Sequence, residues 1–203
     1  VTVLPTPETT EPAPEPEVIL SEPSIPSEDT TEINPENTIS LKQVDSEVPP
    51  PEVHSCTVVS DETTEINSGP STATWVHPVW TTLLNSSGAK WLWKSYFVDT
   101  ALVPDTTTFT KHIVLTEAPT SATLEIAADN TYTVLVNGVA PSCDGSQLDN
   151  FSTPDTCSIT LQGGDNKLTF TVTNTEGSSD PQGNPAGLQY KVSITGSSCE
   201  APK

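Results

Sequence analysis

The chain has 203 residues, a formal net charge of −20 at pH 7 and seven basic residues, all of them lysines. Nucleic-acid binding needs a basic footprint on the phosphates, and attraction to anionic lipid needs the same, so this charge excludes both partners. No segment approaches the roughly 20 apolar residues of a membrane helix, and we expect no membrane insertion.

The first 55 residues differ sharply in composition from the rest of the chain. They hold eleven of the twenty prolines and twelve of the 27 acidic residues, and they contain no Phe, Tyr or Trp. Such a segment cannot bury enough apolar surface to offset the entropy lost on ordering. We therefore predict an acidic, Pro-rich stalk, linker or inter-subunit arm at 1–55 and one folded domain at 56–203.

One octapeptide occurs twice, as SEDTTEIN at 27–34 and as SDETTEIN at 60–67. Biased composition or a partial duplication is one explanation. The alternative is mimicry, in which the first copy pairs with the sheet edge of a neighbouring subunit. On that hypothesis other copies of this chain are its partners, and the assembly residues are Glu28, Thr31 and Ile33.

All four tryptophans fall within residues 75–93. A domain with no methionine and four phenylalanines needs large side chains in its core, so packing is one interpretation of this cluster. The alternative is an exposed aromatic platform that stacks on sugar rings, for which Trp80 and Trp91 are the candidates.

Five later runs alternate between apolar and polar residues with period two, and no stretch shows helical spacing. The runs are rich in β-branched and aromatic residues. They predict about eight or nine short strands and an all-β fold, an antiparallel two-sheet β-sandwich. Asn137-Gly138 predicts a tight hairpin turn. The runs are TTFTKHIVL (107–115), ATLEIAA (122–128), TYTVLVNG (131–138), KLTFTVTN (167–174) and GLQYKVSI (187–194).

The order of these segments resembles the galactose-binding-like jelly-roll domain of bacterial surface proteins and of glycoside-hydrolase accessory modules, the rhamnosidase group among them. The likeness covers roughly residues 57–196, and its most specific part is IAADNTYTVLVNG at 126–138. The resemblance implies a jelly roll whose relatives bind carbohydrate or act as structural spacers. It implies a structural role for Asp129 at the entry of a strand; contact of Asp129 and Asn130 with a ligand is the alternative.

Four cysteines without a CxxC or any Cys/His ligand spacing predict disulfides. Disulfides indicate an oxidising location, extracellular or on the cell surface, in which case a signal peptide has been removed before Val1. Four cysteines allow three pairings. We favour Cys143–Cys157, which closes a local loop, and Cys56–Cys199, which joins the two ends of the domain.

The segment CDGSQLDNFSTPD gathers Asp144, Asp149 and Asp155 in the loop that the first of these disulfides would close. Oxygen-rich loops can hold calcium, although this spacing matches no EF-hand and its residues are also ordinary turn formers. A structural calcium ion at these three aspartates is therefore a hypothesis, and we expect no other cofactor.

No sequence motif of a hydrolase is present, neither G-x-S-x-G nor H-E-x-x-H. His112 lies in a strand-like run and is expected at the surface or as a cross-strand neighbour. We predict a non-enzymatic extracellular surface protein, a structural or adhesive subunit that forms a filament through its N-terminal extension. The alternative is a carbohydrate-binding accessory module of a glycan-active protein or an adhesin.

Overall fold

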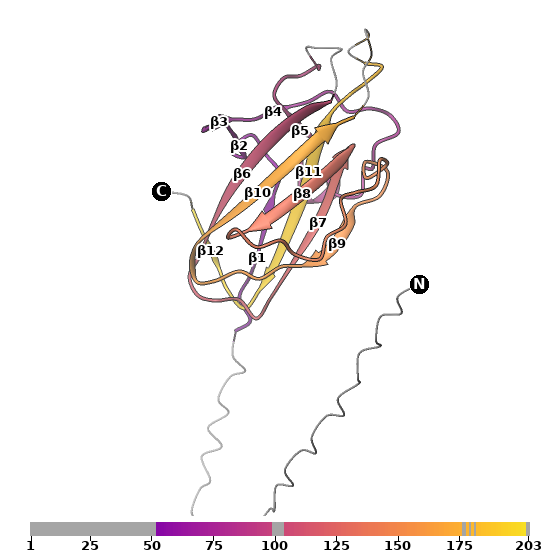
Figure 1. Ribbon diagram of the computed structural model, residues 1–203. Coiled ribbons are helices and arrows are strands. Elements are labelled where there is room, and N and C mark those ends of the chain that lie inside the picture. The colour runs from indigo at the N-terminus through magenta and orange to yellow at the C-terminus, as the bar shows by residue number, and fades with distance from the viewer. Residues whose placement is uncertain (1–51, 99–103, 176–177, 179, 181, 202–203) are drawn as a thin grey trace, which may run out of the picture. The chain divides into compact units, whose positions relative to one another are not determined.

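The computed structural model describes residues 52–98, 104–175, 178, 180 and 182–201. The chain divides into two units, residues 1–48 and residues 49–203, and all described residues belong to the second. They form two antiparallel sheets packed as a sandwich, which confirms the predicted all-β class (Figure 1). The described part holds twelve strands rather than eight or nine, because five of them are only two residues long and too short to show alternation.

Sheet A has the strand order β4-β5-β11-β7-β9, and β1 pairs with the far end of β11. Its long central strands, β7 and β11, pair along their whole lengths. A short 3-10 turn, Asn85–Ser87, lies in the connection between β4 and β5. The strands are β1 (Ser55–Val59), β4 (Thr72–Ala73), β5 (Leu92–Trp93), β7 (Ser121–Asp129), β9 (Asp155–Ser158) and β11 (Gly187–Thr195).

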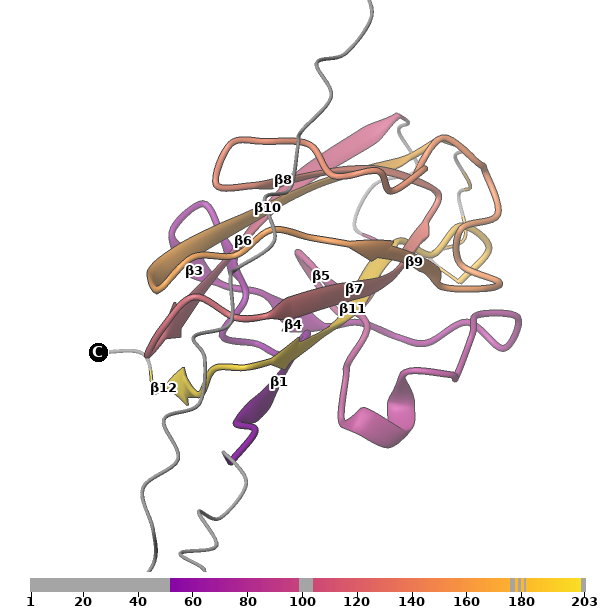
Figure 2. The same ribbon diagram turned by 90° about the horizontal axis from the view of Figure 1, so that it is seen from below.

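Sheet B has the order β3-β2-β6-β10-β8, and β12 pairs with the end of β6. Figure 2 shows this sheet as a second layer that lies over sheet A. The strands are β2 (Glu65–Ile66), β3 (Gly69–Pro70), β6 (Asp105–Leu115), β8 (Thr131–Val136), β10 (Gly164–Asn174) and β12 (Cys199–Glu200).

The core lies between the two sheets and follows the period-two pattern of the sequence. Phe109, Ile113 and Leu115 of β6 are all buried on one face. Phe170 of β10 stacks on Tyr190 of β11 with their ring centroids 4.6 Å apart. Each such buried side chain contributes about 1.5–3 kcal/mol of hydrophobic stabilisation, so this face holds the sheets together.

The Asn137-Gly138 turn has the predicted conformation. The two residues have φ angles of 52° and 83°, and Val136 and Val139 form a bridge on either side. A type I′ turn requires positive φ at both central residues, which Asn and Gly adopt most readily. The turn therefore ends β8 and reverses the direction of the chain.

Both favoured disulfides are present, and no described cysteine is free. Cys56–Cys199 joins β1 of sheet A to β12 of sheet B, with the Cα atoms 5.8 Å apart. Cys143–Cys157 closes the loop before β9, with the Cα atoms 5.3 Å apart. In the part of the chain that the structure describes, no helix has the length and apolar character needed to cross a bilayer.

Candidate functional site

Trp80 and Trp91 lie inside the domain, with 3% and 2% of their surfaces exposed. Their rings pack against each other with centroids 4.2 Å apart and cover Ala127 on the outer face of β7. Nε1 of Trp80 donates a hydrogen bond of 2.7 Å to the carboxylate of Asp129. Because other side chains cover both rings, neither can stack on a sugar ring from solvent. These two tryptophans therefore belong to a small second core and do not form the exposed platform considered for them.

Asp129 and Asn130 hold the turn between β7 and β8. Asp129 is buried and accepts the Trp80 hydrogen bond. Oδ1 of Asn130 accepts bonds of 2.9 Å from both the backbone N–H and the hydroxyl of Thr175, and its Nδ2 donates to the carbonyl of Leu148. These contacts fix two neighbouring loops, so the structural role of the pair has direct geometric support.

The three aspartates considered for calcium do not converge. Asp144 accepts two hydrogen bonds from Ser146, which hold the pKa of its carboxyl below the usual value. Asp155 accepts a bond of 2.7 Å from the hydroxyl of Tyr132. Within the described ranges no three His, Cys, Asp or Glu side chains are grouped as metal ligands. Calcium binding at Asp144, Asp149 and Asp155 therefore stays a hypothesis without geometric support: Ser146 donates to Asp144, the Tyr132 hydroxyl donates to Asp155, and the three carboxylates are not grouped.

A different set of rings reaches the surface. Trp75, His77, Tyr96 and Phe97 form what we call the aromatic cluster, in which Tyr96 is 54% exposed and the other three are partly exposed. Phe97 lies edge-on to Tyr96, with centroids 4.7 Å apart, and 6.2 Å from Trp75. Trp75 lies edge-on to His77 at 5.5 Å. The cluster is therefore one connected aromatic surface.

The β4–β5 pairing positions this cluster. The backbone N–H of Trp75 donates to the carbonyl of Tyr96 at 2.8 Å, and the Thr74 hydroxyl donates to the same carbonyl at 3.0 Å. Nδ1 of His77 accepts the backbone N–H of Val79, which places the proton of the neutral ring on Nε2. The cluster therefore offers ring faces, a phenol hydroxyl and an imidazole N–H.

Sequence reasoning did not select Tyr96, because it considered only the tryptophans as candidates for an exposed platform. The local pattern of WLWKSYF carries no signal for its exposure, since Leu92 has the same parity as Lys94 and Tyr96 but is fully buried.

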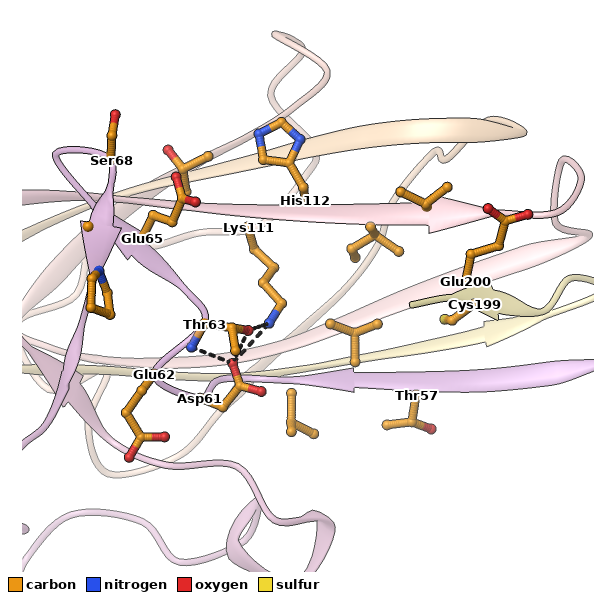
Figure 3. Close-up of a pocket in the computed structure, with 17 residues that line it drawn as sticks. Thr57, Asp61, Glu62, Thr63, Glu65, Ser68, Lys111, His112, Cys199 and Glu200 are labelled. Carbon is orange, nitrogen blue, oxygen red and sulfur yellow. Dashed lines mark hydrogen bonds and ion pairs between the residues drawn. The ribbon is translucent and has the colours of Figure 1, made fainter. Parts of the chain in front are cut away.

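A cavity of 610 Å³, which we call the lateral groove, lies between β1 and β6 and is closed at its ends by residues 61–70 and by β12 (Figure 3). Lys111 points into it from β6, makes an ion pair of 2.9 Å with Asp61 and donates to the hydroxyl of Thr63. Burial opposes ionisation of Asp61, but hydrogen bonds from Thr63 and Lys111 and the Lys111 charge hold its pKa below the usual value. His112 lies on the outer side and pairs with Asp165 at 3.0 Å, as expected for an exposed cross-strand residue.

No family model and no curated protein matches this chain. Among solved structures, the α-L-rhamnosidase of Streptomyces avermitilis matches 57% of this chain with 12% of its own, at 23% identity and a TM-score of 0.43. A family 35 carbohydrate-binding module from Clostridium thermocellum matches 68% of this chain with 97% of its own, at 16% identity and a TM-score of 0.39. A module of the same family from Paenibacillus barcinonensis matches 72% with 99%, at 13% identity and a TM-score of 0.38.

These structural neighbours, a rhamnosidase and carbohydrate-binding modules, are of the kinds that the sequence resemblance indicates. Their TM-scores lie below 0.5, so they carry no argument about what this chain binds. The assembly residues Glu28, Thr31 and Ile33 lie outside the described residues.

Proposed function

We propose that this protein is a non-catalytic, extracellular carbohydrate-binding module. The observation that supports the proposal is the aromatic cluster, whose Tyr96 ring is more than half exposed beside Trp75 and Phe97. Soluble proteins bury most aromatic surface, and connected exposed rings mark contact with a ligand that has its own apolar face. The C–H face of a sugar ring is such a surface, and its hydroxyls match the polar groups of His77 and Tyr96.

The charge of the protein narrows the ligand class. A chain with a net charge of −20 repels anionic glycans at low salt, and the aromatic cluster brings no lysine or arginine of its own. We therefore propose neutral sugars as the ligands rather than uronic acids or sulfated chains. The two disulfides support an extracellular location, where such glycans occur.

The proposal is binding rather than hydrolysis because the sequence carries no nucleophile or metal motif of a hydrolase. Asp61, one of the carboxylates that line the lateral groove, accepts hydrogen bonds from Lys111 and Thr63. Its depressed pKa suits an ion pair and not a proton donor at neutral pH.

Binding to a glycan array, followed by titration calorimetry on the strongest neutral ligand, tests the proposal. Tyr96→Ala is expected to weaken binding about tenfold, since one stacking ring contributes about 0.5–1.5 kcal/mol beyond its buried area. Tyr96→Phe keeps the ring and is expected to retain most of the affinity. Val139→Ala, which alters a side chain that is 70% exposed elsewhere, serves as the control. Full affinity in Tyr96→Ala, or a preference for anionic glycans, would contradict the proposal.

A further inference from the structure

The second copy of the repeated octapeptide, residues 60–67, has a defined place at the lateral groove. Asp61 makes the ion pair with Lys111. Thr64 is fully buried, and its hydroxyl bonds to that of Tyr190 at 2.7 Å. Ile66 lies opposite Phe109 of β6 and packs against the core. Three side-chain contacts therefore hold this segment to the domain.

The first copy, residues 27–34, carries the same contact groups in the same order. The two copies differ only in that the acidic pair reads Glu-Asp in the first and Asp-Glu in the second. Glu28 supplies a carboxylate at the position of Asp61, and Thr31 and Ile33 correspond to Thr64 and Ile66. The groups that contact Lys111, Tyr190 and the core are thus all present in the first copy.

The receiving surface is an incompletely paired sheet edge. β6 pairs with β2 at Phe109 and Thr110 and with β12 at Val114 and Leu115, both on the side away from β10. Among the described residues no strand pairs with Lys111–Ile113 on that side. Only two residues of the segment 60–67 therefore pair with β6, so an exchange of this segment breaks few backbone hydrogen bonds to that strand.

We propose that residues 27–34 of a second copy of this chain exchange with residues 60–67 and take their place on β6. Exchange fits the charges better than simple addition, because the groove already contains Asp61, Glu62, Glu65 and Glu200 (Figure 3). Three further acidic residues beside these would repel them, whereas replacing one copy by the other leaves the charge unchanged.

The exchange trades like contacts for like contacts, as in domain swapping, so its equilibrium depends on protein concentration. Residues 35–51 link the first copy to the described domain, which starts at Glu52 just before β1. These 17 residues span at most about 60 Å when fully extended. Each copy both donates a segment and offers a groove.

Directed cross-linking of the full chain tests the exchange. Glu65 lies directly opposite Thr110, so Glu32 of the donor would lie opposite Thr110 of the acceptor. A chain with Glu32→Cys is mixed with a chain with Thr110→Cys in a glutathione redox buffer, and the disulfide-linked heterodimer is identified by mass. We expect it to form about tenfold faster than with Glu15→Cys, a matched donor outside the octapeptide, and faster still as the concentration rises.

Two further variants make every outcome decisive. Glu65→Cys with Thr110→Cys in one chain must form an intramolecular bond, which verifies the register. Thr31→Asp with Ile33→Asp, added to the Glu32→Cys donor, should reduce the heterodimer to the Glu15→Cys level.

Equal rates for Glu32→Cys and Glu15→Cys overturn the proposal. Concentration-independent cross-linking within one chain that carries both Glu32→Cys and Thr110→Cys overturns the second copy as donor. Neither result bears on glycan binding by the aromatic cluster.

Discussion

Trp75 and Trp80 stand five residues apart in the sequence, yet they have different surroundings. Trp80 is buried and its Nε1 is bonded to Asp129, whereas Trp75 is partly exposed and shares an edge contact with His77. A buried indole needs an acceptor for its N–H, and a buried carboxylate needs donors, so Trp80 and Asp129 satisfy each other. This mutual satisfaction makes Trp80 a structural residue.

Trp80→Phe should therefore destabilise the domain more than Trp75→Phe. It removes a donor from a buried carboxylate and leaves a cavity beside Trp91, together about 2–4 kcal/mol of unfolding free energy. Trp75→Phe is expected to cost less than about 1 kcal/mol. Urea denaturation of both variants measures the difference, and similar midpoints would show that the Trp80–Asp129 bond contributes little.

At the scale of elements, β6 places the charged Lys111 between two apolar residues of its buried face. Lys111 has the same parity as Phe109 and Ile113, and only 11% of its side chain is exposed. The segment 60–67 accommodates this charge because Asp61 and Thr63 reach it across the groove. The segment 60–67 therefore allows a charged side chain to lie on the buried face of β6.

Asp61→Asn should lower the free energy of unfolding at neutral pH, and this loss should disappear in acid. The pKa of Asp61 is lower in the folded chain than its ordinary value of 3.8, so its contribution is present above that value and disappears as pH falls through the folded pKa. We expect about 1 kcal/mol at pH 7, because 37% of the carboxylate side chain is exposed and solvent screens the pair. Denaturation from pH 2 to pH 7 measures it. Glu62→Gln, at the more exposed pair with Lys90, is the control and should change stability less. An undiminished Asp61→Asn effect at pH 2 would refute the ionic origin.

At the scale of the whole molecule, the two disulfides act over different lengths of chain. Cys56–Cys199 joins residues 143 positions apart and links the two sheets, whereas Cys143–Cys157 spans 14 positions. In the chain-entropy view, a longer closed loop removes more freedom from the unfolded chain. The long-range bond is therefore the main covalent support of the sandwich.

Replacing Cys56 and Cys199 together by serine should cost about 2 kcal/mol more than replacing Cys143 and Cys157, from the logarithmic dependence on loop length. Thermal or urea denaturation of both double variants measures the difference. An equal or larger loss from the local pair would mean that native contacts around the loop before β9, and not loop entropy, dominate.

The strands and the inward faces of β6, β10 and β11 were predictable because alternation is a local property of the chain. The same holds for the Asn137-Gly138 turn, whose φ angles these two residues favour. The exposure of the tryptophans and the arrangement of the three aspartates could not be predicted from the local sequence. Burial of Trp80 needs Ala127 and the acceptor Asp129, which is 49 residues away, and the directions of Asp144 and Asp155 depend on hydrogen bonds made after folding.

The amino-acid sequence by itself determined the charge, the all-β class and the supply of disulfides, since composition and period-two patterning need no knowledge of distant contacts. Only the tertiary structure decided which rings stay at the surface, and that residues 60–67 bridge Lys111 and Tyr190. The physical reason is that exposure and pairing depend on neighbours far along the chain, as for Thr64 and Tyr190, which are 126 positions apart.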